Sequence, residues 1–586
     1  WGVDHVDVLS WAIRRGANVW PSAAQLRVSL NGQQIEPSAL SFTRTHGAVA
    51  SAVAPSSGSV TGGSAVVLTG AALKGGDNYT CRFGSTVVLA SLAAEESVTC
   101  VSPPNCGGPM PVQTSLNAQQ YAPGVLYTYF GGAACSETFG APSSVGGDAG
   151  GGTAIASLSP LSGPLVGQTR IVVSGRAFSF GSEYVCEIGG SLSYAPASFL
   201  SDQQVACFTP PGGTGAVSVR VSLNAQQFVG NESVGFLYHA QPYIDAVSPT
   251  SGTEVGGTLV NVSGGGFADG SHYVCAFGSE LVDASYVAAY GVISCVSPAG
   301  VFGSQPAVEV SLNAQQYTSE RLPFRYHGVA SVSSFSPSSG PGDGETLVRV
   351  YGVDLGGGSA YRCRFDSCGA CHTAWSCGAC VVNATYVAAE SAGVGESIVC
   401  SSPRLSGWRG DAGAVVGLEV SLNSQQFTAS NTSLLAYTYY ATPVVSSVSP
   451  SLGPIGGETQ VVIRGAGVDG MGSGARCRFG SAVVPAAYDA ASEGLVCTSL
   501  AVGDESAGSA SLAVSLNAQQ FGPSSLAYGF YALPHVSAVL PAAGPEAGGT
   551  TLQVQGAGLA GGAGAGPHYL CRFTIATSNA PLVTTA

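Results

Sequence analysis

The sequence predicts an all-β protein built as a tandem array of small sandwich domains. One stretch, Ser-Leu-Asn-x-Gln-Gln followed by an aromatic or branched apolar residue, occurs six times, at Ser29–Ile35, Ser115–Tyr121, Ser222–Phe228, Ser311–Tyr317, Ser421–Phe427 and Ser515–Phe521. Its starts are 86, 107, 89, 110 and 94 residues apart, a period that fits a whole small domain. Apolar residues alternate before it, as at Val217, Val219 and Val221, which is typical of half-buried strands. Frequent turn glycines and prolines, with no helical period, complete the pattern of an all-β sandwich.

The repeats divide the chain into domains and connections. We assign 1–46 to the end of a preceding repeat, 48–130 to unit 1, 131–153 to a Gly-rich linker, 155–239 to unit 2, 243–327 to unit 3, 331–440 to unit 4 with a cysteine-rich insertion, 443–531 to unit 5 and 534–586 to a partial unit 6. The later connections are a few residues long and contain proline, which limits bending. We therefore expect an extended array, with any bend at 131–153.

The repeated stretch predicts a β-hairpin. Asn224 lies where the chain must reverse, and asparagine tolerates the left-handed conformation. Ala225 follows it and disfavours a two-residue type I′ turn, so a longer turn with a bulge is expected. The favoured interpretation of the two glutamines is that they hydrogen-bond the turn backbone. The alternative is that they form a repeated docking ladder along the chain.

Most cysteines recur in pairs at one place in each repeat. We expect disulfides between Cys81 and Cys100, Cys186 and Cys207, Cys275 and Cys295, Cys363 and Cys400, and Cys477 and Cys497, with Cys106 and Cys135 tying the linker to unit 1. Cys571 is expected to pair about 20 residues downstream, as its equivalents do. Glycosylation sequons begin at Asn78, Asn231, Asn261, Asn383 and Asn431. Together these features predict a secreted or cell-surface glycoprotein.

Composition argues against several other classes. The net charge of −14 and the absence of a basic patch disfavour nucleic acid as a partner. No apolar run in the segment reaches the roughly 18 residues that cross a bilayer. The Gly-x-Gly-x-x-Gly matches at 465–470 and 556–561 precede a strand pattern where a dinucleotide site needs a helix, so they are interpreted as turn glycines. With no catalytic constellation, no enzyme activity and no cofactor are expected.

The order of motifs within each unit carries a family resemblance. It runs Pro-x-x-Gly-Pro, Gly-Gly-Thr, strand, Gly-x-x-Phe, Cys-x-Phe-Gly, Cys-x-Ser-Pro, hairpin and Phe-x-Tyr, and it resembles the IPT/TIG family of immunoglobulin-like domains over about 540 residues. Thr258 after Gly256-Gly257 fits well, whereas Gly167-Gln168 departs from the glycine pair but keeps the turn. The resemblance implies tandem immunoglobulin-like sandwiches like those of plexin-like receptors, fibrocystin-like proteins and algal flagellar-surface proteins. The lysine-poor, Ala/Gly/Ser-rich composition favours the flagellar, mastigoneme-type group.

The insertion in unit 4 is unique among the repeats and contains Cys368, Cys371, Cys377 and Cys380. Four thiolates could bind zinc, but the gap between the two Cys-x-x-Cys pairs is short for such a site. Cys368-x-x-Cys371-His372 also matches a c-type haem attachment. The favoured interpretation is two disulfides, with no metal. Trp375 on so constrained a loop is the candidate partner contact, and the alternative is that it covers its own sandwich.

Three functions remain in competition. The favoured one is a structural extracellular rod that builds or links surface filaments, with other copies of itself or other cell-surface proteins as partners. The second is an adhesin or receptor ectodomain that binds a protein or glycan. The third, an intracellular DNA-binding protein, is disfavoured by the acidic balance and the paired cysteines.

Overall fold

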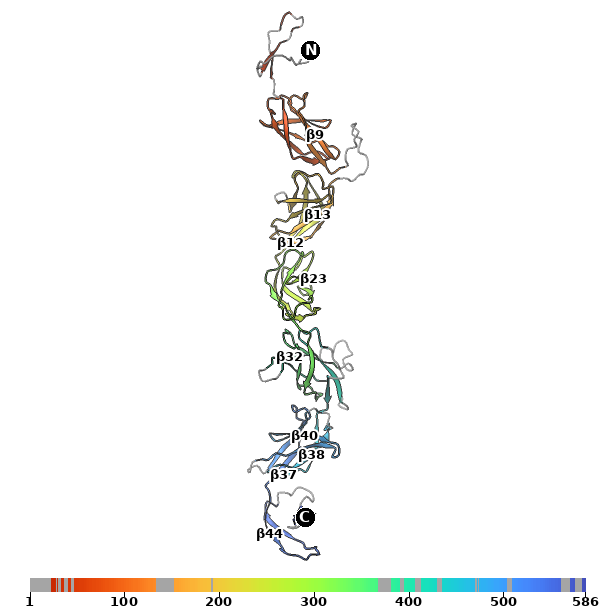
Figure 1. The fold of residues 1–586 in the computed structure, drawn as a ribbon, viewed down its shortest axis with the longest axis vertical. Coiled ribbons are helices and arrows are strands. Elements are labelled where there is room, and N and C mark those ends of the chain that lie inside the picture. The colour runs from red at the N-terminus through yellow and green to blue at the C-terminus, as the bar shows by residue number, and fades with distance from the viewer. Residues whose placement is uncertain are drawn as a thin grey trace.

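The computed structural model shows five β-sandwiches stacked end to end along one axis in the order of the chain (Figure 1). It describes residues 23–27, 29, 33–35, 40–43, 47–132, 152–190, 193–366, 381–389, 395–405, 413–428, 435–468, 472, 474–502, 508–559, 570–574 and 582–585. We refer to the sandwiches as units 1 to 5. The chain is all-β, as predicted from the alternating apolar pattern.

Unit 2 shows the architecture of one sandwich. Its strands are β11 (Ala154–Ser159), β12 (Ser162–Pro164), β13 (Arg170–Arg176), β14 (Val185–Ile188), β15 (Tyr194–Ser201), β16 (Gln204–Phe208), β17 (Gly215–Ser222) and β18 (Phe228–His239). They lie in the order β11-β13-β16-β15-β14-β17-β18-β12, and β12 is parallel to β18. β15 pairs with β14 at one end and with β16 at the other, so it joins the two layers that enclose the core.

The other units repeat this topology. Unit 1 contains β3 (Val49–Ala54), β4 (Ser57–Ser59), β5 (Ala65–Ala71), β6 (Thr80–Phe83), β7 (Thr86–Ala94), β8 (Ser97–Val101), β9 (Gly108–Ser115) and β10 (Val125–Phe130). Unit 3 contains β19 (Tyr243–Ser248), β20 (Ser251–Thr253), β21 (Leu259–Gly265), β22 (Val274–Phe277), β23 (Glu280–Val287), β24 (Val292–Val296), β25 (Ala307–Ser311) and a last strand divided into β26 (Leu322–Pro323) and β27 (Arg325–His327).

Units 4 and 5 keep the same strand order. Unit 4 contains β28 (Ser331–Ser336), β29 (Ser339–Pro341), β30 (Leu347–Val353), β31 (Arg362–Asp366), β32 (Val381–Val387), β33 (Ser397–Ser401), β34 (Ala414–Ser421) and β35 (Ala436–Tyr440). Unit 5 contains β36 (Val444–Ser449), β37 (Leu452–Pro454), β38 (Gln460–Ala466), β39 (Arg476–Phe479), β40 (Ala482–Asp489), β41 (Gly494–Thr498), β42 (Gly508–Ser515) and β43 (Ala527–Tyr531).

Short strand pairs lie outside the five sandwiches. Before unit 1, β1 (Ala23–Leu26) pairs with β2 (Leu40–Thr43). After unit 5, β44 (His535–Leu540) pairs with β45 (Gln553–Ala557), and β46 (Leu570–Phe573) pairs with β47 (Leu582–Thr585). The β44–β45 pair has the same register and bulge as β11 and β13, the first long strands of unit 2. It therefore resembles the start of another unit.

Each sandwich has its own buried core and one disulfide between its layers. In unit 2 the bond joins Cys186 on β14 to Cys207 on β16, with Cα atoms 6.4 Å apart and both residues buried. The equivalent bonds are Cys81–Cys100, Cys275–Cys295, Cys363–Cys400 and Cys477–Cys497. Around each bond pack the inward-facing residues of both layers, including an aromatic residue of the closing strand such as Phe236.

Candidate functional surfaces at the joints between units

The Asn-x-Gln-Gln residues form a tight turn whose shape is set by the asparagine side chain. In unit 2, Asn224 Oδ1 accepts hydrogen bonds from the backbone N–H groups of Gln226 and Gln227 at 3.1 and 3.2 Å. The strands meet again at Ser222 and Phe228, so the turn is longer than two residues. The left-handed residue is Ala225, with φ of 57°, and the expectation that Asn224 would adopt this conformation is wrong. Asn224 instead uses its side chain to cap the turn.

At the joint between units 1 and 2, this turn binds the start of β5 in unit 1. The Gln226 amide pairs with the Ala65 backbone: Nε2 donates to the carbonyl O and Oε1 accepts from the N–H, both at 2.9 Å. Ser64 Oγ donates to Gln227 Oε1 at 2.9 Å, and Asn224 Nδ2 donates to Ser64 Oγ at 3.2 Å. The first glutamine therefore binds the backbone as a neighbouring strand would.

The three following joints use the same pattern. The first glutamine pairs with one backbone residue of the preceding unit, through a donated and an accepted bond of 2.7–3.0 Å: Gln315 with Arg170, Gln425 with Leu259 and Gln519 with Leu347. The second glutamine accepts from a threonine hydroxyl at 3.2–3.3 Å: Gln316 from Thr169, Gln426 from Thr258 and Gln520 from Thr346. Its Nε2 also donates to the carbonyl that precedes this threonine, in Gln168, Gly257 and Glu345 respectively.

Two recurrent motifs of the sequence are thus the two halves of one contact. We call Asn224–Gln227, Asn313–Gln316, Asn423–Gln426 and Asn517–Gln520 the docking turns. We call Ser64–Ala65, Thr169–Arg170, Thr258–Leu259 and Thr346–Leu347 the acceptor edges. The favoured interpretation, that the glutamine side chains hydrogen-bond the backbone of their own turn, is wrong: within the described docking turns, the second glutamine accepts a bond only from the asparagine side chain. Their amides bind the preceding unit, which is the ladder that we considered as the alternative.

A glycine of the Pro-x-x-Gly motif keeps each acceptor edge in place. A Cβ at Gly163 would lie 2.1 Å from Thr169 Oγ1 and 2.8 Å from the Phe236 ring. No larger residue fits between the closing strand and the threonine that meets the docking turn. This motif therefore connects the core of a unit to its joint.

The joint between units 1 and 2 is docked like the others, although the linker at 131–153 separates the units in sequence. Besides the turn, Ser57 Oγ donates to Ser182 Oγ at 2.9 Å, as Ser162 does to Ser271 at 3.0 Å in the next joint. Unit 1 continues the line of the rod, so the array has no bend at this joint, which is where we expected any bend to lie (Figure 1).

In units 1 and 4, the last residue of the closing strand also lies at a joint. Phe130 and Tyr440 belong to the core clusters of the unit that follows them. In units 2 and 3 the equivalent residues are His239 and His327, both buried, whose Nε2 atoms have no hydrogen-bond partner among the described residues. Their Nδ1 atoms lie 2.8 Å from the carbonyl oxygens of the next residue. Burial lowers the pKa of both imidazoles, and the nearby Asp269 and Glu254 carboxylates oppose this effect only in part, while Arg325 adds to it at His327.

We therefore expect acid to destabilise units 2 and 3 through these histidines. The imidazoles are neutral when folded and have a pKa of about 6.5 when unfolded, so their contribution is complete above that pH and is lost as the pH falls below it. Urea unfolding at pH 7.5 and 5.5 should show a smaller acid loss in a His239→Phe/His327→Phe variant, which copies Phe130. An equal loss in both proteins would contradict this assignment.

Sequence reasoning missed a charged side chain beside the Asn-x-Gln-Gln turn of units 1, 2, 4 and 5, of which the last three are docking turns. The aromatic residue after the second glutamine lies under an arginine, with guanidinium carbon to ring centroid distances of 4.1–5.6 Å: Arg82 over Tyr121, Arg220 over Phe228, Arg364 over Phe427 and Arg478 over Phe521. Such distances are typical of cation–π contacts. Comparison of the repeats could have found it, because three of the four arginines follow the first cysteine of their unit.

The other predicted site residues lie apart from the joints or outside the described residues. Cys106 is disulfide-bonded, whereas Cys135, the four cysteines at 368–380, Trp375 and Asn431 lie outside the described residues. Cys571 is unpaired in the described part of the chain. The sequon residues Asn78, Asn261 and Asn383 are exposed, and Asn231 is half-buried with Nδ2 3.3 Å from the Ile155 carbonyl.

The described residues contain neither a cluster of metal-ligating side chains nor a helix that could span a membrane. No three or more His, Cys, Asp or Glu side chains there are grouped so that they could hold a metal ion. None of the helices in the described ranges has the length and apolarity to span a membrane.

Repeated sandwiches joined by docking turns define a tandem-domain rod. The family model "IPT/TIG domain" matches residues 48–129, 154–238, 242–326 and 443–530, which together exceed half of the chain. The chain belongs to the IPT/TIG domain family. Unit 4 is not among the matched segments, yet its described strands have the same order, with an insertion between β31 and β32.

Known relatives share part of this array. Fibrocystin-L of Mus musculus is 25% identical over 323 residues, which cover 54% of this chain and 7% of that protein. Plexin-B1 of Homo sapiens is 36% identical over 121 residues, which cover 20% of this chain and 6% of that protein. The chain thus spans less than a tenth of the length of either relative. The solved full extracellular region of plexin A4 aligns with 91% of this chain and 54% of that chain at 13% identity and a TM-score of 0.31.

Proposed function

We propose that this chain is an extracellular spacer, a rod of IPT/TIG units that holds the structures at its two ends at a fixed separation. The observation that carries the proposal is the amide docking that recurs at four successive joints. A flexible tether needs no specific contact between domains, whereas a spacer must resist bending at each joint. The inter-layer disulfides and exposed sequons support an oxidising, extracellular location with N-glycans.

The energetics of one joint favour a docked state. Each docking turn makes several hydrogen bonds to the preceding unit, and each such bond contributes about 1 kcal/mol net. The connection is short at most joints, so the effective concentration of turn and edge is high and little entropy opposes docking. Because bending at successive joints accumulates, the chain stays extended only if each of the four joints is docked, as the hydrogen bonds favour.

The proposal is tested by imaging the purified chain by negative-stain electron microscopy and measuring the angle at each joint. A spacer should give narrow angular distributions at the four docked joints, and variants without the glutamine amides should give broad ones. Broad distributions in the unmodified chain would contradict the proposed function.

A narrower role is assembly into surface filaments, with flagellar, mastigoneme-type filaments favoured by the lysine-poor, Ala/Gly/Ser-rich composition. Its partners would be other copies or other cell-surface proteins, and the contact would lie on the unique insertion at 368–380 with Trp375. Replacing 368–380 by the short loop of unit 3 should leave folding and secretion intact and abolish assembly. A variant that assembles normally would exclude the insertion as the contact.

The second candidate is an adhesion or receptor ectodomain that binds a protein or glycan. The similarity to plexins supports this candidate. It differs from the filament role because the binding partner would be a different molecule and not another copy of this chain. Native filaments purified from cells separate the two: this chain should be a repeating component of the filament in the first case and absent from it in the second.

A further inference from the structure

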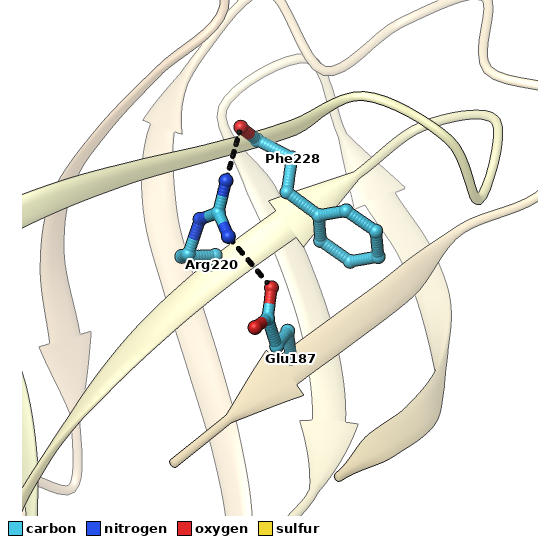
Figure 2. Close-up of polar contacts among 3 residues, drawn as sticks. All are labelled: Glu187, Arg220 and Phe228. Carbon is cyan, nitrogen blue, oxygen red and sulfur yellow. Dashed lines mark hydrogen bonds and ion pairs between the residues drawn. The ribbon is translucent and has the colours of Figure 1, made fainter. Parts of the chain in front are cut away.

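An arginine–carboxylate pair lies between two strands of unit 2, next to the docking turn. Arg220 on β17 and Glu187 on β14 are register partners, and Arg220 Nη1 donates to Glu187 Oε2 at 3.0 Å (Figure 2). The Glu187 side chain is only 6% exposed, so the arginine compensates a buried carboxylate. The arginine side chain itself is 46% exposed, so the pair joins a buried carboxylate to the surface of the sheet.

The same arginine reaches the residue that ends the docking turn. Its Nη2 donates to the Phe228 carbonyl O at 3.3 Å, and its guanidinium carbon lies 5.6 Å from the centroid of the Phe228 ring (Figure 2). Phe228 directly follows Gln227, whose Oε1 accepts from Ser64 of unit 1. A continuous line of contacts therefore runs from Glu187 through Arg220 and Phe228 to the joint.

Unit 4 contains the same arrangement with the two charges exchanged between the strands. There Arg364 occupies the β31 position equivalent to Glu187, and Glu419 occupies the β34 position equivalent to Arg220. Arg364 Nε donates to Glu419 Oε2 at 2.6 Å, and its guanidinium lies 4.3 Å from the Phe427 ring. The arginine lies on β17 in unit 2 and on β31 in unit 4, yet in both units it lies over the aromatic residue that follows the docking turn.

We propose that Arg220, held by Glu187, is a positioning residue that fixes the docking turn of unit 2 in the orientation that unit 1 accepts. A hydrogen bond to the Phe228 carbonyl and a cation over its ring restrain the residue beside Gln227, so less conformational freedom is lost when the joint docks. The inference rests on the proposed function, because it assumes that docking stiffens the rod.

The decisive experiment is a charge exchange in the full chain, read by single-molecule FRET between labels on units 1 and 2. Glu187→Arg alone places two arginines opposite each other, and Arg220→Glu alone places two carboxylates there. Each should raise the undocked fraction of this joint roughly fivefold to tenfold. The double variant Glu187→Arg/Arg220→Glu copies unit 4 and should return the undocked fraction to near its original value.

A second measurement separates positioning from simple stabilisation of the sheet. Hydrogen exchange of β14 and β17 reports the stability of unit 2, and Arg220→Gln is a milder variant that should fold if a charge reversal does not. A joint that stays docked in Arg220→Gln, or failure of the exchanged pair to restore docking, overturns the proposal. Faster hydrogen exchange of β14 and β17 without opening of the joint overturns it as well, since the pair would then only stabilise the sheet.

Two internal controls complete the design. The joint between units 3 and 4, which depends on Arg364 and Glu419, should remain docked in every unit 2 variant. Gln226→Ala/Gln227→Ala tests the proposed function itself. If that variant stays docked, the docking turn does not hold the joint and the proposed function fails; if it opens but Arg220 variants do not, only the positioning role fails.

Discussion

Replacing Cys275 and Cys295 by alanine is expected to lower the free energy of unfolding of unit 3 by about 3 kcal/mol or more. The bond closes a loop with a sequence separation of 20, and loop closure of this size restricts the unfolded chain by roughly that amount. Both sulfurs are also buried between the layers, so alanine leaves unfilled space in the core. Urea unfolding followed by hydrogen exchange of β22 and β24 measures the loss.

The chain supplies its own controls for this experiment. Unit 5 has an equivalent bond, Cys477–Cys497, with the same separation, and its exchange rates should be unchanged because its core is separate. A change below about 1 kcal/mol in unit 3 would contradict the stabilising role of the bond. Non-reducing peptide mapping of the unmodified protein should recover all five inter-layer pairs, and free thiols at these positions would contradict the extracellular proposal.

Replacing Gln315 and Gln316 by alanine is expected to weaken docking of unit 3 on unit 2 by about 2–4 kcal/mol, because several hydrogen bonds of about 1 kcal/mol are lost. Both bonds to the Arg170 backbone and those to Thr169 and the Gln168 carbonyl disappear. Residues Gln168 and Arg170 lie near solvent, so water can satisfy their freed groups and neither unit should unfold. Single-molecule FRET between units 2 and 3 should change from a narrow to a broad distribution.

The matched control is another pair of neighbouring glutamines, Gln203 and Gln204, which are exposed and make no side-chain hydrogen bond to another unit among the described residues. Alanine at these two positions removes the same atoms without touching a joint. A narrow distribution should therefore persist in this control. If the Gln315→Ala/Gln316→Ala distribution is equally narrow, the docking turn is not what holds the joint.

The sandwiches were predictable because the signals for them are local. Alternation at Val217, Val219 and Val221 indicates a strand with one buried face, and these residues line or approach the unit 2 core. The spacing of the cysteines is a local signal of the same kind. The lengths of the strands and turns between Cys186 and Cys207 bring the two residues opposite each other, where a disulfide can form. Repetition of these signals in each unit made the fold class unambiguous.

The joints were harder to predict because their partners lie far apart in sequence. Gln226 and Ala65 are 161 residues apart, and a glutamine pattern alone does not show what faces it in space. Even so, the docking turn and a Gly-x-Ser/Thr sequence at the acceptor edge recur together in successive units, which could have indicated that the two segments contact each other. The exchange of charge between Glu187–Arg220 and Arg364–Glu419 would also have been visible on comparing the repeats.

The left-handed residue of the turn shows a different limit. Alanine has no intrinsic preference for positive φ, yet Ala118, Ala225, Ala314 and Ala518 all adopt it. The asparagine before each alanine caps the turn with its side chain, and that cap compensates the cost of the alanine conformation. The preference of asparagine for positive φ therefore led us to expect the left-handed conformation at Asn224, whereas Ala225 adopts it.

Small-angle X-ray scattering tests most directly whether docking turns hold the rod straight. The unmodified chain would be compared with a variant in which all eight docking glutamines, Gln226, Gln227, Gln315, Gln316, Gln425, Gln426, Gln519 and Gln520, are replaced by alanine. The unmodified chain should give the pair-distance distribution of a single long rod, and the variant should give a shorter, broader distribution while its strand content by circular dichroism is unchanged. Identical distributions for the two proteins would contradict the central claim.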